Sequence, residues 1–190
     1  MTQFETHTID SAPEESKQAL RTLEEGLGFV PNLAAAMAES PSLATGFVDF
    51  RAPLGNTELT GVEREIVALG VAIEHDCSYC MAAHSTFALM QDADEDAVRA
   101  ARAGDAPDDA RLGALYRFAR AMVAAKGRVG DEETRALLEA GYSRRAVLDV
   151  VAQIGHTTLA SLAYALSEAP VDDEFAAQTW RRTEAVAAQA

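Results

Sequence analysis

Both cysteines of the chain and two of its four histidines lie in one short segment, EHDCSYCMAAHSTFA, residues 74–88. If a helix begins at Cys77, then Cys77, Cys80 and His84 occupy positions i, i+3 and i+7 and share one face. Two cysteines within one helical turn are close enough for a disulfide, since bridged Cα atoms usually lie about 4.4–6.8 Å apart. The spacing therefore predicts a redox-active pair with an imidazole one turn away.

The same segment favours a reactive thiolate. A helix N-terminus and a neighbouring histidine both lower the pKa of a cysteine, from about 8.5 into a range of about 3.5–7.5. Asp76 is a candidate N-cap for a helix from Cys77 to about Gln91, so both effects would act on the pair. His84, one turn beyond Cys80, would accept the thiol proton.

Two other interpretations of these residues stay open. Cysteine is among the most buried residue types and often packs as a small hydrophobe, and a histidine on an apolar helix face is usually a core residue. Alternatively, the two cysteines and His84 bind zinc, with Glu65 or Glu74 as a fourth ligand. Structural zinc sites usually draw ligand pairs from two separate segments. Here the three ligands lie within eight residues, so we predict neither a metal site nor a cofactor.

The rest of the sequence predicts the helices that would position this segment. The chain has 190 residues, of which 48% are hydrophobic and 6% aromatic. Apolar residues recur at helical spacing and the alternation typical of strands is missing. We therefore expect an all-α fold of about eight to ten helices, forming a single domain over residues 1–190. Within it, the segment LTGVEREIVALGVAI predicts a helix with one apolar face formed by Val62, Ile66, Leu69 and Ile73.

Glu65 lies at the edge of this apolar face, next to Val62 and Leu69, whereas Arg64 is expected to point the other way. A partly buried carboxylate there would orient His84 or share a proton with it, directly or through water. A solvated surface acid is the alternative interpretation of Glu65.

Two further residues are candidates for the wall of a substrate pocket. Tyr79 lies between the two cysteines and would control access to them. His156 lies in a mostly apolar helix near the C-terminus, where a packed core histidine is the alternative interpretation.

The charge of the chain excludes some classes of partner. Its formal net charge of -14 would repel nucleic acid and anionic membranes, so we expect neither as a partner. The first ten residues, MTQFETHTID, have no basic start and no apolar run, and no apolar segment approaches the roughly 20 residues of a membrane span. These features predict a cytoplasmic protein. In that compartment a close cysteine pair is more often redox-active or metal-binding than structural.

The motif resembles a known family. The segment LTGVEREIVALGVAIEHDCSYCMAAHSTFA is similar to the core motif of the AhpD-like, carboxymuconolactone decarboxylase superfamily. In that motif a glutamate precedes Cys-x-x-Cys by twelve positions and a histidine follows the second cysteine by four, as Glu65, Cys77, Cys80 and His84 do here. The segments LGFVPNLAAAMAESP and GHTTLASLAYALSEAPVDDEF also resemble the family's terminal parts.

The chain departs from the family at three positions. Tyr79 stands where the best-understood peroxidase branch has a second histidine. Ser161 and Tyr164 lie in a segment where related chains often carry asparagines.

The resemblance implies an AhpD-like helical domain with thiol-dependent peroxidase or disulfide reductase activity on hydrogen peroxide or organic hydroperoxides. It also implies homo-oligomers, commonly trimers or hexamers, and a lipoyl-bearing reductant in the best-understood branch. On this interpretation Cys80 attacks the peroxide, Cys77 resolves the product as a disulfide, His84 is the base and Glu65 orients it. An external dithiol, on a lipoyl-bearing or thioredoxin-like protein, then reduces the pair. The two cysteine roles could be reversed, because Cys77 is nearer to the amides of the first turn.

Two alternative functions remain. The first is a cysteine-independent decarboxylase or hydrolase of a small cyclic lactone that uses Glu65 and His84 as an acid–base pair. The family's decarboxylase branch generally lacks the cysteine pair, which argues against this function. The second is a zinc-binding or redox-sensing protein.

Overall fold

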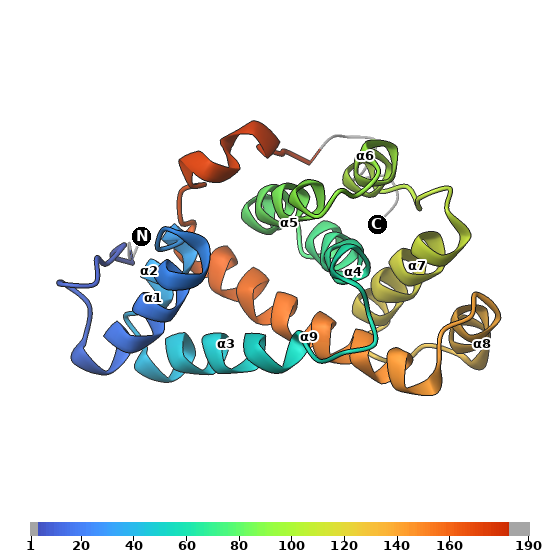
Figure 1. Cartoon of the computed structure of the whole chain (residues 1–190), viewed down its shortest axis with the longest axis horizontal. Helices are drawn as coiled ribbons and strands as arrows, with labels where there is room; N and C mark the ends of the chain where they lie inside the picture. The colour runs from blue at the N-terminus through green and yellow to red at the C-terminus, as the bar shows by residue number, and fades with distance from the viewer. Residues whose placement is uncertain (1–3, 183–190) are drawn as a thin grey trace.

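The computed structural model describes residues 4–182, and this part of the chain contains helices and no β-strand (Figure 1). The predicted all-α fold is therefore confirmed. The elements in order are α1 (Glu14–Leu27), α2 (Asn32–Met37), α3 (Pro41–Leu54), α4 (Gly61–Glu74), α5 (Ser78–Met90), α6 (Glu95–Ala103), α7 (Ala110–Ala124), α8 (Asp131–Glu139), α9 (Arg144–Ser167) and the 3₁₀ helix η1 (Asp173–Gln178).

Two helices, α4 and α9, form the centre of the fold. Figure 1 shows α9 running along the molecule, with α1 to α3 towards one end and α7 and α8 towards the other. Helix α4 packs against α5, α7 and α9, and residues 66–73 are all buried. The single apolar face predicted for this helix is therefore too narrow, because neighbouring helices cover it on several sides. At Gly70 a Cβ atom would lie 3.2 Å from the Tyr116 carbonyl oxygen, so the close approach of α7 to α4 favours glycine there.

Hydrogen bonds around Glu63 fix the start of α4. The Thr60 hydroxyl caps the helix by accepting from the Glu63 N–H, and the Glu63 carboxylate accepts in return from the Thr60 N–H at 2.8 Å. The same carboxylate accepts from the Tyr142 hydroxyl at 2.7 Å and from Arg111 at 3.2 Å. Burial opposes ionisation of Glu63, yet these hydrogen bonds together hold its pKa below the ordinary value. The anchored carboxylate lies two residues before Glu65.

The segment that follows α9 returns over α5 and is fixed there by polar contacts (Figure 1). Asp172, just before η1, accepts a hydrogen bond from the Tyr79 hydroxyl and another from the N–H of Asn32, the latter at 2.9 Å. At the other end of η1 the Trp180 indole N–H donates to the Arg102 carbonyl at 2.9 Å. Residues from the C-terminal segment therefore cover the helix that carries the cysteine pair.

Helix α9 is long and apolar enough, by length and composition alone, to cross a membrane. This differs from the expectation that no apolar segment approaches the length of a membrane span, because Asp149 and His156 interrupt the apolar run in the sequence. A core helix passes the same test, and one side of α9 is buried against other helices. Its other side exposes a row of large apolar side chains, which are Leu148, Val151, Leu162 and Leu166.

Candidate active site

The turn between α4 and α5 places the first cysteine at the start of α5. Asp76 adopts a left-handed conformation, with φ of 53°, and makes no capping bond. Cys77 is the N-cap instead, because its Sγ atom accepts the backbone N–H of Cys80 at 3.1 Å. The prediction of Asp76 as the cap was therefore wrong by one residue: the turn uses Asp76, so the helix begins at Ser78.

The two cysteines are joined by a disulfide, with their Cα atoms 5.2 Å apart. Cys77 is fully buried, whereas Cys80 forms part of the wall of a cavity. Behind the disulfide, the Ser161 Oγ atom lies 3.4 Å from the Cys80 Sγ atom and donates to the Thr157 carbonyl at 2.9 Å. The sulfur of Cys80 therefore faces the cavity on one side and a hydroxyl on the other.

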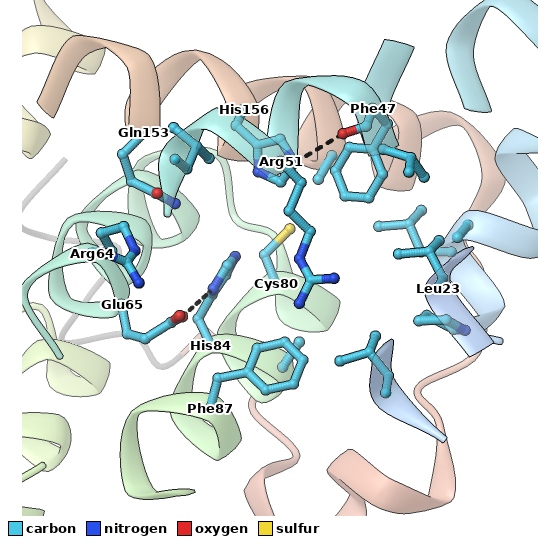
Figure 2. A pocket seen from close by; sticks show the side chains of 18 of the residues that line it. Leu23, Phe47, Arg51, Arg64, Glu65, Cys80, His84, Phe87, Gln153 and His156 are labelled. Carbon is cyan, nitrogen blue, oxygen red and sulfur yellow. Dashed lines mark hydrogen bonds and ion pairs between the residues drawn. The ribbon is translucent and has the colours of Figure 1, made fainter. Parts of the chain in front are cut away.

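Glu65 and His84 form a close pair across the junction of α4 and α5. The Nδ1 atom of His84 lies 2.6 Å from the Oε2 atom of Glu65, and both side chains are about 15% exposed. Donation of the Nδ1 proton to the carboxylate leaves Nε2 as the nitrogen that accepts protons. Figure 2 shows His84 and Cys80 on the same side of the cavity, so a base and a sulfur border one space.

The cavity has a volume of about 630 Å³, which is within the usual range of about 300–1,000 Å³ for small-molecule sites. It lies between α1, α2 and α3 on one side and α4, α5 and α9 on the other. Glu65, Cys80 and His84 line it together with the two candidate pocket residues, Tyr79 and His156.

His156 is a packed residue as well as a wall residue. Its ring stacks on Phe47 with centroids 4.4 Å apart, and its Nε2 atom lies 3.3 Å from the Phe47 carbonyl oxygen. Burial and, to a smaller extent, the nearby charges of His84 and Arg51 lower the pKa of His156 to about 4. The imidazole is therefore neutral at physiological pH.

Tyr79 uses its hydroxyl away from the disulfide. The hydroxyl donates to Asp172 and accepts the N–H of Leu33 at 3.4 Å. Burial raises the pKa of the Tyr79 phenol, and the Asp172 carboxylate raises it further, so the phenol stays neutral. Burial also raises the pKa of Asp172, although the hydrogen bonds from Tyr79 and Asn32 act against this. The Tyr79 ring thus stands at the cavity wall while its hydroxyl fastens η1 to α5.

Sequence reasoning missed several residues of the site. Ser161 gave a usable signal, because Gln153, Thr157 and Ser161 recur every fourth residue as buried polar groups in an otherwise apolar helix. Arg51 gave none, since α3 meets the site only through tertiary packing. Arg64 was expected to point away, but it lines the cavity because the cavity extends past Glu65 towards the end of α3.

The part of the chain that the structure describes offers no set of ligands for the predicted alternative of a metal site. Within residues 4–182 no three His, Cys, Asp or Glu side chains are grouped so that they could hold a metal ion. Of the two proposed fourth ligands, Glu65 is bound to His84, and Glu74 accepts from Arg120 at 2.5 Å.

An all-α fold with a Cys-x-x-Cys pair at a helix N-terminus, beside a glutamate–histidine pair and a cavity, is similar to that of AhpD-like proteins. Residues 41–125, which contain all four motif residues, match the model of the carboxymuconolactone decarboxylase family. The resemblance predicted from the sequence is therefore confirmed. No curated protein has a detectable sequence match to the chain.

Solved structures share the fold over most of the chain. An alkylhydroperoxidase AhpD core, a peroxidase-related protein from Ralstonia eutropha, is 22% identical, with a TM-score of 0.79, over 91% of this chain and 93% of its own. A peroxidase-related protein from Silicibacter is also 22% identical, with a TM-score of 0.75 over 94% and 98%. The debrominase Bmp8 is 21% identical, with a TM-score of 0.72 over 87% and 90%. At these identities the similarity establishes the fold alone, so the reaction has to be inferred from the residues of the site.

Proposed function

We propose that the protein is a thiol-dependent peroxidase that reduces hydrogen peroxide or organic hydroperoxides through Cys77 and Cys80. The observation that carries the proposal is that Cys80 lines the same cavity as His84, whose Nδ1 atom is held by Glu65. Catalysis by a thiol needs a sulfur that substrate can reach, a base near it and a second sulfur within bonding distance. This site offers all three.

In the first step His84 takes the thiol proton of Cys80, and the resulting thiolate attacks one peroxide oxygen. The S–O bond forms as the O–O bond breaks, which leaves a sulfenic acid on Cys80. The departing alkoxide, or hydroxide, takes the proton back from His84 and leaves as alcohol or water. Glu65 would stabilise the imidazolium that exists between these two proton transfers.

In the second step the thiolate of Cys77 attacks the sulfenic sulfur of Cys80. The S–S bond forms, and hydroxide leaves and is protonated to water, giving the disulfide seen in the structure. An external dithiol, carried by a lipoyl-bearing or thioredoxin-like protein, would restore both thiols by exchange. A cytoplasmic location, the homo-oligomeric state and a single-domain organisation belong to the same proposal.

The assignment of roles to the two cysteines rests on their surroundings. Cys80 is on the cavity wall, whereas Cys77 is fully buried and its sulfur accepts a backbone N–H. A peroxide in the cavity would therefore meet Cys80 first. This supports Cys80 as the attacking residue and Cys77 as the resolving one.

The proposal is tested by counting thiols during titration of the reduced protein with cumene hydroperoxide. We expect one equivalent of peroxide to remove both thiols within minutes at pH 7. Cys77→Ser should accumulate a trappable sulfenic acid on Cys80, whereas Cys80→Ser should react far more slowly. The proposal fails if both thiols survive, and the role assignment fails if Cys80→Ser is oxidised at Cys77 as fast as the parent.

The same variants test the alternatives. Turnover of a small cyclic lactone that persists when both cysteines are replaced by serine would support the decarboxylase or hydrolase function. Stoichiometric zinc in protein purified without chelator, released on oxidation, would support the zinc-binding or redox-sensing function instead.

A further inference from the structure

The cavity beside Cys80 has mainly apolar walls. Leucine, valine and phenylalanine side chains from α1, α2, α3 and α5 form much of it, namely Leu23, Leu27, Leu33, Phe47, Val48 and Phe87. Hydrogen peroxide needs no such surface, whereas an aliphatic or aromatic body gains free energy by covering it. The walls therefore suit a substrate much larger and less polar than hydrogen peroxide.

The charged side chains that line the cavity are two arginines and one glutamate, Arg51, Arg64 and Glu65. The carboxylate of Glu65 is bound to His84, so the arginines dominate the local charge. This is opposite in sign to the chain as a whole, whose formal net charge is -14. A cationic cavity in so acidic a protein points to an anionic group on the ligand.

The two arginines differ in their contacts. Arg64 donates to the Leu59 carbonyl at 2.8 Å. The side chain of Arg51 makes no hydrogen bond or ion pair with any residue in the range 4–182. Figure 2 shows its side chain extending from α3 into the space bordered by Cys80, Phe87 and Leu23. Its charge acts within the cavity, since it is one of the groups that lower the pKa of His156, after burial and His84.

A purely structural role for Arg51 is the competing explanation. It lies in the last turn of α3, where a cation is favoured by the helix dipole. The dipole explains a cation at this position but not the direction of its side chain, which extends into the space bordered by Cys80, Phe87 and Leu23 (Figure 2). Arg51 is exposed and its side chain borders the cavity, where its planar set of N–H donors matches a carboxylate.

We propose that this cavity binds an apolar molecule with one carboxylate group, and that Arg51 recognises the carboxylate. The inference deepens the proposed peroxidase function, on which it rests, by naming the substrate class as hydroperoxides of apolar monocarboxylic acids, such as fatty acids. The carboxylate binds to Arg51, the apolar body lies on the leucine and phenylalanine walls, and the hydroperoxide reaches Cys80.

Binding to the oxidised protein tests the inference without any turnover. Decanoate and 1-decanol have the same alkyl chain, but only decanoate carries a negative charge. Isothermal titration calorimetry with each ligand therefore measures the effect of that charge on binding. We expect decanoate to bind about tenfold tighter or more, because an Arg–carboxylate pair is charge-assisted on both sides. Arg51→Gln should remove this preference and keep the affinity for 1-decanol, whereas Arg99→Gln, on an exposed part of α6, should retain the preference.

The outcomes separate the inference from the function on which it rests. Equal affinity of the parent for the two ligands, absence of binding, or retention of the preference in Arg51→Gln would each overturn the carboxylate site. An equal loss of affinity for decanoate and 1-decanol in Arg51→Gln would also overturn it, because the arginine would then only maintain the shape of the cavity. In contrast, an intact preference for decanoate in a protein that consumes no hydroperoxide would overturn the peroxidase function and leave the site standing.

A kinetic comparison then tests the carboxylate site and the peroxidase function together. Linoleate hydroperoxide and its methyl ester share the reacting group and the apolar body. We expect Arg51→Gln to raise KM for the acid about tenfold or more and to leave KM for the ester and kcat for both nearly unchanged, because the lost contact is made before and during the reaction alike. An equal change for acid and ester would contradict the assignment of Arg51 to the carboxylate.

Discussion

The Nδ1 atom of His84 lies 2.6 Å from the Oε2 atom of Glu65, so a carboxylate on α4 holds an imidazole on α5 that is nineteen residues away in sequence. Both side chains are largely shielded from solvent, and both border the cavity that contains Cys80. The carboxylate thereby selects which nitrogen of His84 is free to exchange protons with the cavity. This relationship makes the function of Glu65 testable separately from that of the cysteines.

Replacement of Glu65 by glutamine keeps the size of the side chain and removes its charge. We expect Glu65→Gln to lower kcat/KM for a hydroperoxide, because the imidazolium that forms on His84 loses its stabilising carboxylate. His84→Gln should cost more, about 10²–10⁴-fold, which is the usual contribution of a general base. Stopped-flow measurement of thiol loss at pH 7 gives both rates.

Glu74→Gln is the matched control for this prediction. Glu74 belongs to the same helix but is paired with Arg120 and does not line the cavity. An equal loss of rate in Glu65→Gln and Glu74→Gln would show that the effect is structural. An unchanged rate in Glu65→Gln would remove the carboxylate from the mechanism.

Tyr79→Phe tests the attachment of the C-terminal segment to α5. The change leaves the buried Asp172 carboxylate without its hydroxyl donor and the Leu33 N–H without its acceptor. We expect the free energy of unfolding at pH 7 to fall by about 1–3 kcal/mol, the usual cost of an unsatisfied buried polar group. Urea unfolding followed by circular dichroism measures the difference.

The effect of Tyr79→Phe should depend on pH in a defined direction. Burial raises the pKa of Asp172 in the folded protein above its ordinary value, and loss of the tyrosine donor raises it further. Protonated Asp172 thus contributes stability to the folded protein at low pH, and this contribution is lost as the pH rises through the folded pKa of Asp172. The stability cost of Tyr79→Phe should therefore be larger at pH 7 than at pH 4. Tyr164→Phe, which loses only a bond to Ser78, should show no such pH dependence. A cost that is equal at both pH values would contradict the contribution of Asp172.

Local spacing was sufficient to predict the residues closest to the proposed chemistry. Glu65, Cys77, Cys80 and His84 lie on two consecutive helices joined by a short turn, so helical periodicity largely determines their mutual positions. The exact cap could not be predicted, because the left-handed backbone of Asp76 depends on how α5 packs on α4.

Residues brought in from distant parts of the chain could not be predicted. Asp172 reaches Tyr79 across 93 residues, and Arg51 reaches the cavity only because α3 packs beside α9 and α1. No local pattern encodes these contacts, since they depend on the packing of whole helices. The width of the buried surface on α4 escaped prediction for the same reason.

His156 gives a further prediction about stability and pH. Its pKa in the folded protein is lowered to about 4, mainly by burial, whereas an unfolded histidine titrates near about 6.5. Between these values the unfolded chain binds a proton that the folded protein does not, so stability falls as the pH is lowered from about 6.5 to about 4. His156→Gln should flatten this part of the profile by up to about 3 kcal/mol.

The comparison concerns the slope of the profile, because glutamine also loses the stacking of the ring on Phe47 and so lowers stability at every pH. Titration of the His156 ring by NMR measures the same property directly. A midpoint near 6.5 for that ring, or an identical slope in His156→Gln and the parent, would contradict the prediction.

The exposed apolar row on α9 bears on the proposed self-association. Leu148, Val151, Leu162 and Leu166 recur at intervals of three, eleven and four residues, which places them on one side of the helix. Leu162 is 55% exposed and Leu166 is 72% exposed. The four side chains form two exposed pairs, Leu148 with Val151 and Leu162 with Leu166, and Phe50 of α3 lies near Gly155 between the pairs. Exposed apolar groups gathered on one side of a helix are typical of a surface that another protein covers. A second copy of the chain is the partner that the homo-oligomer proposal supplies.

Introduction of charge into this row should disrupt the oligomer. Leu162→Glu combined with Leu166→Glu should lower the molar mass in solution to that of the 20.2 kDa chain, because an assembled interface would bury two unpaired carboxylates in each copy. Multi-angle light scattering after size exclusion measures the mass, and thermal unfolding of the dissociated variant checks that the chain stays folded. Leu138→Glu, the same change at a partly exposed leucine of α8, is the control. A parent protein that is already monomeric, or a double variant with the parent's larger mass, would show that this row of α9 does not hold copies together.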